Sequence, residues 1–127
     1  MKVIEGDNVT YIDCDDTLVS WSTYLINLYP EQCKVFKTWK GDPGTSLLPI
    51  EETIDYLKKS KIHGGTVIVW SAGGWEWAKN VVEVLELTEY VDAVMSKPIR
   101  YVDDLPSGKF MGTWVNLEPK FKKRMKK

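Results

Sequence analysis

The sequence predicts an α/β fold in which helices cover a mainly parallel sheet. Residues 9–12 (VTYI) and 66–70 (TVIVW) are rich in β-branched side chains, which favour strands. The second segment is apolar on both faces, as is typical of a strand buried inside a parallel sheet. Residues 50–59 lie between them and have helical spacing, and strand, helix, strand is the unit from which parallel sheets are built.

The size and composition favour one globular domain. The chain has 127 residues, of which 43% are hydrophobic and 28% are charged. It lacks both the roughly 18 consecutive apolar residues needed to cross a bilayer and an N-terminal secretory signal. We therefore expect a single domain over residues 1–119, a cytoplasmic location and no membrane partner. Cys14 and Cys33 share no metal-type spacing and are expected to be reduced thiols.

Two helices are expected on the basis of apolar periodicity. In residues 50–59, Ile50, Ile54 and Leu57 share one helical face and charged residues separate them. In residues 75–87, alanine, valine and leucine recur at the same spacing. Each helix would follow one predicted strand and lead into the next, which completes the alternation of a parallel sheet.

The remaining segments are shorter and less regular. Residues 91–95 and 99–102 are apolar and are expected to be strands, and residues 113–117 are a candidate edge strand. Residues 20–49 are aromatic and are interrupted by Pro30 and by a Gly-Asp-Pro-Gly sequence. We expect this region to be a short flap or a hairpin-like insertion over the edge of the sheet.

The charge is distributed unevenly along the chain. The net charge is −1, but six of the last eight residues are basic, so subtracting them leaves about −7 on residues 1–119. A basic tail over residues 120–127 could attract a polyanion such as nucleic acid. The alternative is a solvated terminus that only improves solubility.

Residues 11–19 (YIDCDDTLV) place three carboxylates at the end of the first predicted strand. Residues two apart in an extended chain share a face, so Asp13 and Asp15 are expected to project to one side. The carboxyl ends of parallel strands form the edge at which open α/β sheets bind ligands. An Asp-rich turn built by Asp16 and Thr17 is the alternative.

Each later strand also ends near a residue with useful chemistry. Ser71 follows the strand at 66–70 and two glycines come soon after, so its hydroxyl and nearby backbone N–H groups could bind an anion. Lys97 follows the third segment, and Asp103 and Asp104 end the fourth. Singly, these residues could be a helix cap, a solvated lysine and turn residues. Together they favour one site.

In order, these residues resemble the four motifs of the haloacid dehalogenase-like (HAD) phosphohydrolases. The matching positions are Asp13-Cys14-Asp15-Asp16-Thr17 for the DxDxT motif, Ser71 for the second motif, Lys97 for the third, and Asp103-Asp104 for the acidic fourth. The resemblance covers about residues 8–106 and implies a three-layer, Rossmann-like HAD core. The insertion at 20–49 is too short for a separate cap domain, which implies a small, capless member.

The resemblance also implies a role for each residue. Asp13 would be the nucleophile that forms an aspartyl-phosphate, and Asp15 would be the general acid and base. The implied phosphate-binding residues are Thr17, Ser71, Ala72, Gly73 and Lys97, and the implied Mg²⁺ ligands are Asp13, Asp15, Asp103 and Asp104. Carboxylates about 4 Å apart repel by roughly 4 kcal/mol, and a divalent cation would relieve that cost. The sequence does not decide whether Asp103 or Asp104 binds the ion directly.

The function that this resemblance implies is magnesium-dependent hydrolysis of a phosphomonoester. An open site suits a bulky substrate such as a nucleic-acid end or a phosphoprotein, and nucleotides are a further option. Several tryptophans could stack on a base. Two alternatives stay open: a phosphotransferase, in which an alcohol replaces water, and a nucleic-acid-binding or regulatory protein that has the fold without turnover. Homo-oligomers are a further option, because a neighbouring subunit could help to exclude water from an open site.

Overall fold

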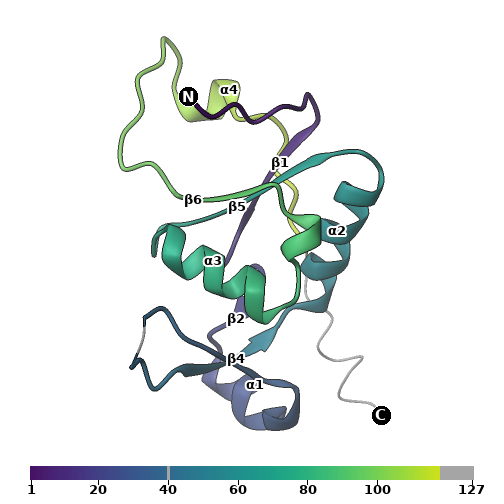
Figure 1. Ribbon diagram of the computed structural model, residues 1–127, viewed down its shortest axis with the longest axis vertical. Helices are drawn as coiled ribbons and strands as arrows, with labels where there is room; N and C mark the ends of the chain where they lie inside the picture. Colours follow the sequence, from purple (N-terminus) through teal and green to yellow (C-terminus); the bar gives the residue numbers. More distant parts are fainter. Residues whose placement is uncertain (40, 118–127) are drawn as a thin grey trace.

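The computed structural model describes residues 1–39 and 41–117 and shows a mixed α/β fold with two small sheets (Figure 1). The strands are β1 (Val9–Asp13), β2 (Val19–Ser20), β3 (Lys34–Phe36), β4 (Thr45–Pro49), β5 (Thr66–Ser71) and β6 (Ala93–Ser96). The α-helices are α1 (Thr23–Leu28), α2 (Glu51–Ile62), α3 (Trp75–Val84) and α4 (Ser107–Phe110), and the 3₁₀ helices are η1 (Pro30–Gln32) and η2 (Thr88–Tyr90).

The larger sheet is parallel and has the strand order β1-β5-β6. Its register aligns Asp13 of β1 with Trp70 of β5, and Ser71 of β5 with Ser96 of β6. The carboxyl ends of all three strands therefore meet at one edge. The predicted α/β class with a mainly parallel sheet is confirmed, as are the strands at 9–12 and 66–70.

Helices α2 and α3 pack on one face of this sheet. One buried cluster contains the strand residues Ile12, Val67 and Val69 together with Ile54, Leu57, Ala78, Val81, Val82 and Leu85 of the two helical segments. The three strand residues share a face, because Ile12 pairs with Val69 and Val67 lies two positions before it. Both predicted helices are thus confirmed, and each uses its predicted apolar face.

The opposite face of the sheet carries aromatic side chains. Tyr11 of β1 stacks on Trp70 of β5 with a centroid separation of 4.4 Å, and Tyr11 remains exposed. Helix α4 contributes no buried residue. The described residues therefore form one helical layer on the sheet, and a second helical layer is not found among them.

The insertion after β1 is more structured than a flap. Strands β2, β4 and β3 form an antiparallel sheet in that order, and Ser22 caps α1 by accepting a hydrogen bond from the Leu25 N–H (3.2 Å). Phe36 and Leu47 are fully buried and belong to the main hydrophobic cluster. The insertion is therefore an extension of the main core.

Two predicted strands are wrong. Residues 99–102 and 113–117 form no strand, and Ile99 and Val102 are 92% and 102% exposed. Only Lys97 and Pro98 separate the end of β6 from residue 99, whereas a parallel neighbour needs a crossover of a dozen or more residues. Instead the chain runs out in a loop, away from α3, before it reaches α4 (Figure 1).

The basic tail of residues 120–127, with nucleic-acid binding and a solvated terminus as its two alternatives, lies outside the described residues. Within residues 1–39 and 41–117, none of the helices has the length and apolar character that a membrane span requires.

Candidate functional site

An ion pair joins the ends of two strands. Asp13 ends β1 and Lys97 follows β6, and the Lys97 Nζ lies 3.4 Å from the Asp13 Oδ1. The Lys97 backbone N–H donates to the Ser71 carbonyl oxygen at 2.9 Å, which holds the lysine against the end of β5. The Lys97 and Asp13 side chains are 36% and 32% exposed. A ligand can therefore reach this pair from solvent.

The Lys97 ammonium also lies 5.7 Å from the ring centroid of Trp70, within the range of a cation–π contact. Trp70 pairs with Asp13 in the register of β1 and β5, so the ring and the carboxylate lie on the same face of the sheet. The lysine thus has two partners on that face.

A tight turn follows β1. The Cys14 carbonyl oxygen accepts hydrogen bonds from the N–H groups of Thr17 (3.1 Å), Leu18 (2.8 Å) and Val19 (3.1 Å). Asp16 adopts a left-handed conformation (φ 58°), which Asp tolerates better than most residues. Its Oδ1 accepts a hydrogen bond from the backbone N–H of the tryptophan five residues later (3.1 Å). Asp16 therefore builds the turn, as the turn alternative for this residue predicted.

Cys14 lies between the two acids and is fully buried. Burial, together with the neighbouring carboxylates of Asp13 and Asp15, raises the pKa of its thiol to about 12. A thiol with so high a pKa stays protonated and is a poor nucleophile at neutral pH. Cys14 is therefore a packing residue, and both cysteines are free, as predicted.

Asp15 is held by two tryptophans. Its Oδ1 accepts hydrogen bonds from the indole Nε1–H of Trp21 (2.8 Å) and of Trp77 (2.9 Å). Trp21 lies between β2 and α1, and Trp77 lies in the first turn of α3. Asp13 and Asp15 thus have different partners: the first contacts Lys97, and the second contacts the two indole groups.

The loop after β5 is organised by Ser71. This residue is fully buried, and its Oγ accepts a hydrogen bond from the Gly73 N–H (3.0 Å). Gly74 has φ 105°, a conformation that favours glycine, and its N–H donates to the Ser71 carbonyl oxygen (3.1 Å). Ala72 and Gly73 are exposed. The loop therefore presents a backbone edge to solvent, while the Ser71 hydroxyl contributes to its internal hydrogen bonding.

Asp103 and Asp104 lie in the loop between β6 and α4. Both are exposed, and the Asp103 Oδ1 accepts a hydrogen bond from the Leu105 N–H (3.0 Å). Among the residues described, no three His, Cys, Asp or Glu side chains are grouped in a way that could hold a metal ion. The four predicted magnesium ligands are thus not assembled as a set in this arrangement. Magnesium binding stays a prediction, and we derive no chemical step through the ion.

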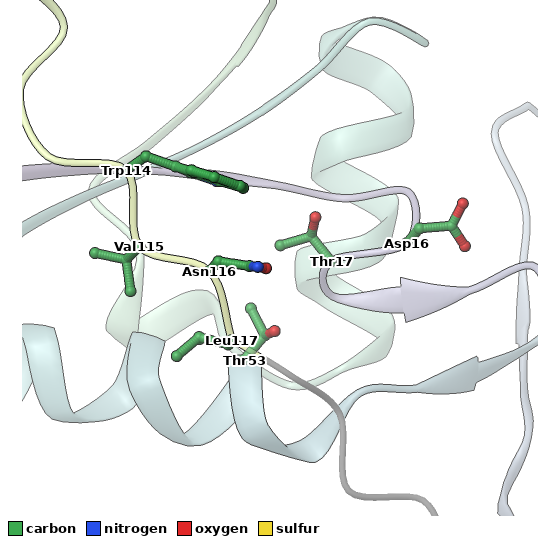
Figure 2. Close-up of a pocket in the computed structure, with 7 residues that line it drawn as sticks. All are labelled: Asp16, Thr17, Thr53, Trp114, Val115, Asn116 and Leu117. Carbon is green, nitrogen blue, oxygen red and sulfur yellow. The ribbon is translucent and has the colours of Figure 1, made fainter.

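Thr17 faces a separate pocket, which is shown in Figure 2. The pocket has a volume of about 120 Å³ and is lined by Asp16, Thr17, Thr53 and residues 114–117. The Thr17 and Asn116 side chains extend toward one another, whereas Asp16 points away (Figure 2). None of the lining residues belongs to the Asp13–Lys97 pair or to the Asp15 contacts. Phosphate binding by Thr17 therefore stays a prediction.

No family model, curated protein or solved structure matches this chain. Any functional assignment therefore depends on the residues described above.

Sequence reasoning identified the acids but missed their tryptophan partners. Trp77 is a core residue that is only 9% exposed. The sequence signal for its hydrogen bond to Asp15 is weak. Helical periodicity predicts that the ring is buried, but it does not reveal which acceptor the indole N–H will contact. Trp21 follows the DxDxT motif by a few residues and lies in a region without clear periodicity.

Proposed function

We propose that this protein is a phosphomonoester hydrolase with Asp13 as its nucleophile. The observation that supports this most directly is the ion pair between Asp13 and Lys97 at the carboxyl edge of the parallel sheet. A carboxylate that attacks phosphorus is established covalent chemistry, and a fixed cation beside it can stabilise charge on the phosphoryl oxygens. The order of the motifs along the chain supports the same reading.

The proposed fold is an HAD-like core. In this scheme β1, β5 and β6 are its first three strands, and they carry the nucleophile, Ser71 and Lys97 at their carboxyl ends. This arrangement agrees with a Rossmann-like sheet. The three-layer architecture that the resemblance implies belongs to the proposal.

The reaction would proceed in two displacements. An Asp13 carboxylate oxygen attacks phosphorus, the phosphorus–oxygen bond to the substrate alcohol breaks, and Asp15 gives its proton to the departing oxygen. Water then attacks the aspartyl-phosphate and passes a proton to Asp15, and the bond between phosphorus and the Asp13 oxygen breaks. Inorganic phosphate leaves, and both carboxyl groups return to their starting states.

Lys97 has an electrostatic role in this scheme. A phosphate monoester and the Asp13 carboxylate are both anions, so their approach is opposed by charge repulsion. The ammonium group 3.4 Å from Asp13 offsets that repulsion, and it is positioned before substrate arrives by its backbone hydrogen bond to Ser71. Magnesium would supply further charge neutralisation when bound.

Nucleotides and nucleic-acid ends are the proposed substrates. Trp21 and Trp75 flank the acids and the Ser71 loop in the chain and are 45% and 52% exposed. Exposed aromatic rings can stack on a base, and such stacking contributes about 1–3 kcal/mol per base. The cytoplasmic location and nucleic-acid binding by residues 120–127 stay predictions.

The test compares the wild type with Asp13→Asn on a panel of phosphomonoesters that spans nucleotides, sugar phosphates and phosphorylated oligonucleotides. We expect magnesium-dependent phosphate release by the wild type and a loss of at least about 10³-fold in the variant, because the amide is a far weaker nucleophile.

Asp16→Asn is the matched control, because it removes one charge nearby and keeps an oxygen acceptor for the turn. We expect this variant to retain turnover within about threefold. Near wild-type activity in Asp13→Asn would show that Asp13 is not the nucleophile. Transfer of phosphate to added alcohols would identify a phosphotransferase. No turnover of any ester would favour the binding or regulatory alternative.

A further inference from the structure

We propose that Trp21 and Trp77 form an indole clamp, defined as their two indole N–H groups on the Asp15 Oδ1, and that this clamp selects the oxygen through which Asp15 transfers protons. The inference rests on the proposed function, because it assigns positioning residues to the acid/base of that reaction. The clamp also links Asp15 to the insertion.

The geometry of the clamp determines which oxygen is free. An indole N–H only donates, so the 2.8 Å and 2.9 Å contacts both require the Asp15 Oδ1 to accept. Each carboxylate oxygen offers about two acceptor sites, and two donors therefore occupy Oδ1. When Asp15 is in its acid form, its proton must be on Oδ2. The clamp thus leaves Oδ2 as the oxygen that can exchange a proton with a reacting group.

The two donors come from different parts of the fold. Trp77 lies in α3 and is largely buried, and its ring packs against Phe36 of β3 with a centroid separation of 5.9 Å. Trp21 is half-exposed and lies at the start of the insertion, where its backbone N–H donates to Asp16. Their rings are 6.1 Å apart. Any shift of the insertion against α3 would therefore change the contacts of Asp15.

A purely structural role would not require this convergence. A packed tryptophan needs one acceptor for its N–H, and any carbonyl or water satisfies it. Here Trp21 and Trp77, from separate parts of the chain, donate to the same oxygen of Asp15, a partly exposed carboxylate. General acid catalysis typically raises the reaction rate 10²- to 10⁴-fold, and this gain depends on the placement of the proton donor. A misplaced Asp15 should therefore impair proton transfer selectively.

The experiment measures kcat/KM for two esters with different leaving groups. p-Nitrophenolate departs readily without a proton, whereas the alcohol of a nucleoside monophosphate needs one. The ratio kcat/KM reports steps up to formation of the aspartyl-phosphate, so later hydrolysis does not obscure the result. We expect Trp77→Phe and Trp21→Phe to lower kcat/KM about tenfold for the nucleotide and less than about threefold for p-nitrophenyl phosphate. The loss for the nucleotide should lie in kcat, whereas loss of base stacking by Trp21 would raise KM and leave kcat unchanged.

Asp15→Asn provides the reference for full loss of the acid, and Trp114→Phe is the matched control. Trp114 is 83% exposed and lies in the segment after α4, so its substitution should lower neither rate. Trp21→Phe removes a half-exposed ring and keeps the assay informative if Trp77→Phe fails to fold, which circular dichroism would reveal.

A second readout does not depend on catalysis. The six tryptophans give six indole N–H signals in a ¹⁵N-labelled sample, and Asp15→Asn should shift two of them, those that disappear in Trp21→Phe and Trp77→Phe. Absence of these shifts would overturn the clamp itself.

The outcomes separate the two proposals. In one outcome the wild type hydrolyses both esters, Asp15→Asn loses activity only on the nucleotide, and the Trp variants lose activity equally on both esters. This outcome would overturn the clamp and leave the proposed function in place. A wild type that hydrolyses neither ester would overturn the proposed function and, with it, the catalytic role of the clamp.

Discussion

Two regions of this protein carry acids after apolar segments. They differ in whether the apolar segment is paired in a sheet and buried. The first is the edge formed by β1, β5 and β6, where the strand residues Val67 and Val69 are fully buried. The second is the segment that follows Lys97, where Ile99 and Val102 are almost fully exposed. In the first region Asp13 meets a cation, whereas in the second Asp103 accepts a hydrogen bond from the backbone N–H of Leu105.

The difference shows what places a functional side chain. A carboxylate at the end of a hydrogen-bonded strand takes its position from the register of the sheet, and its partners come from neighbouring strands. A carboxylate at the end of an unpaired segment has no such constraint and stays solvated. The same residue types in a similar local pattern can therefore lie inside or outside a site.

The largest effect that separates these regions should be on stability. Val69→Ala removes two methyl groups from the core and should lower the free energy of unfolding by about 2 kcal/mol. Val102→Ala is the matched change in the second region and should alter it by less than about 0.5 kcal/mol. Urea unfolding followed by circular dichroism measures both. Equal losses would mean that the second region is packed in solution.

A smaller effect should come from Asp92, which precedes β6. Its Oδ2 accepts from the Val67 N–H (2.8 Å) and its Oδ1 from the Lys61 Nζ (2.7 Å). The Lys61 hydrogen bond, followed by that from Val67, lowers the pKa of Asp92. A carboxyl group with a lowered pKa in the folded state stabilises the protein above its unfolded pKa of about 3.9, and this contribution is lost as the pH falls through the folded pKa.

Asp92→Asn should therefore destabilise the protein by about 0.5–1 kcal/mol at pH 7, a modest value because the ion pair is partly exposed. The difference from the wild type should shrink as the pH falls below about 4. Unfolding curves at pH 7 and pH 3 measure it. A difference that stays constant between these pH values would assign the effect to packing and not to the carboxylate charge.

The smallest effect should come from the second region itself. If Asp103 and Asp104 stay where the structure places them, the double substitution Asp103→Asn/Asp104→Asn should leave the magnesium concentration for half-maximal activity within about twofold of the wild-type value. A magnesium titration of phosphate release measures this. A strongly raised requirement would instead show that the segment reaches Asp13, as the HAD resemblance implies, and would remove the distinction between the two regions.

Much of the fold could be predicted because its signals are local. Strands β1 and β5 follow from β-branched composition, and α2 and α3 follow from apolar spacing that the core then uses. The predicted strand at 99–102 failed for a physical reason. Apolar composition favours a strand only if a partner strand is within reach, and the short connection from β6 gives no crossover to one.

The candidate site was predictable to a similar degree. Asp13 and Lys97 come together because both follow strands of one parallel sheet, and strand ends can be read from sequence. The contacts of Asp15 could not be predicted, since they depend on the rotation of α3 and on the path of the insertion. Those are properties of tertiary packing, which local patterns do not encode.

The buried turn after β1 limits how this sequence can vary. Cys14 occupies the nominally free position between the two acids, yet its side chain is enclosed in the core and its carbonyl oxygen receives three backbone N–H groups. A larger residue there would have to displace core side chains and would alter the spacing of Asp13 and Asp15. Evolutionary drift at this position should therefore be confined to small, apolar residues.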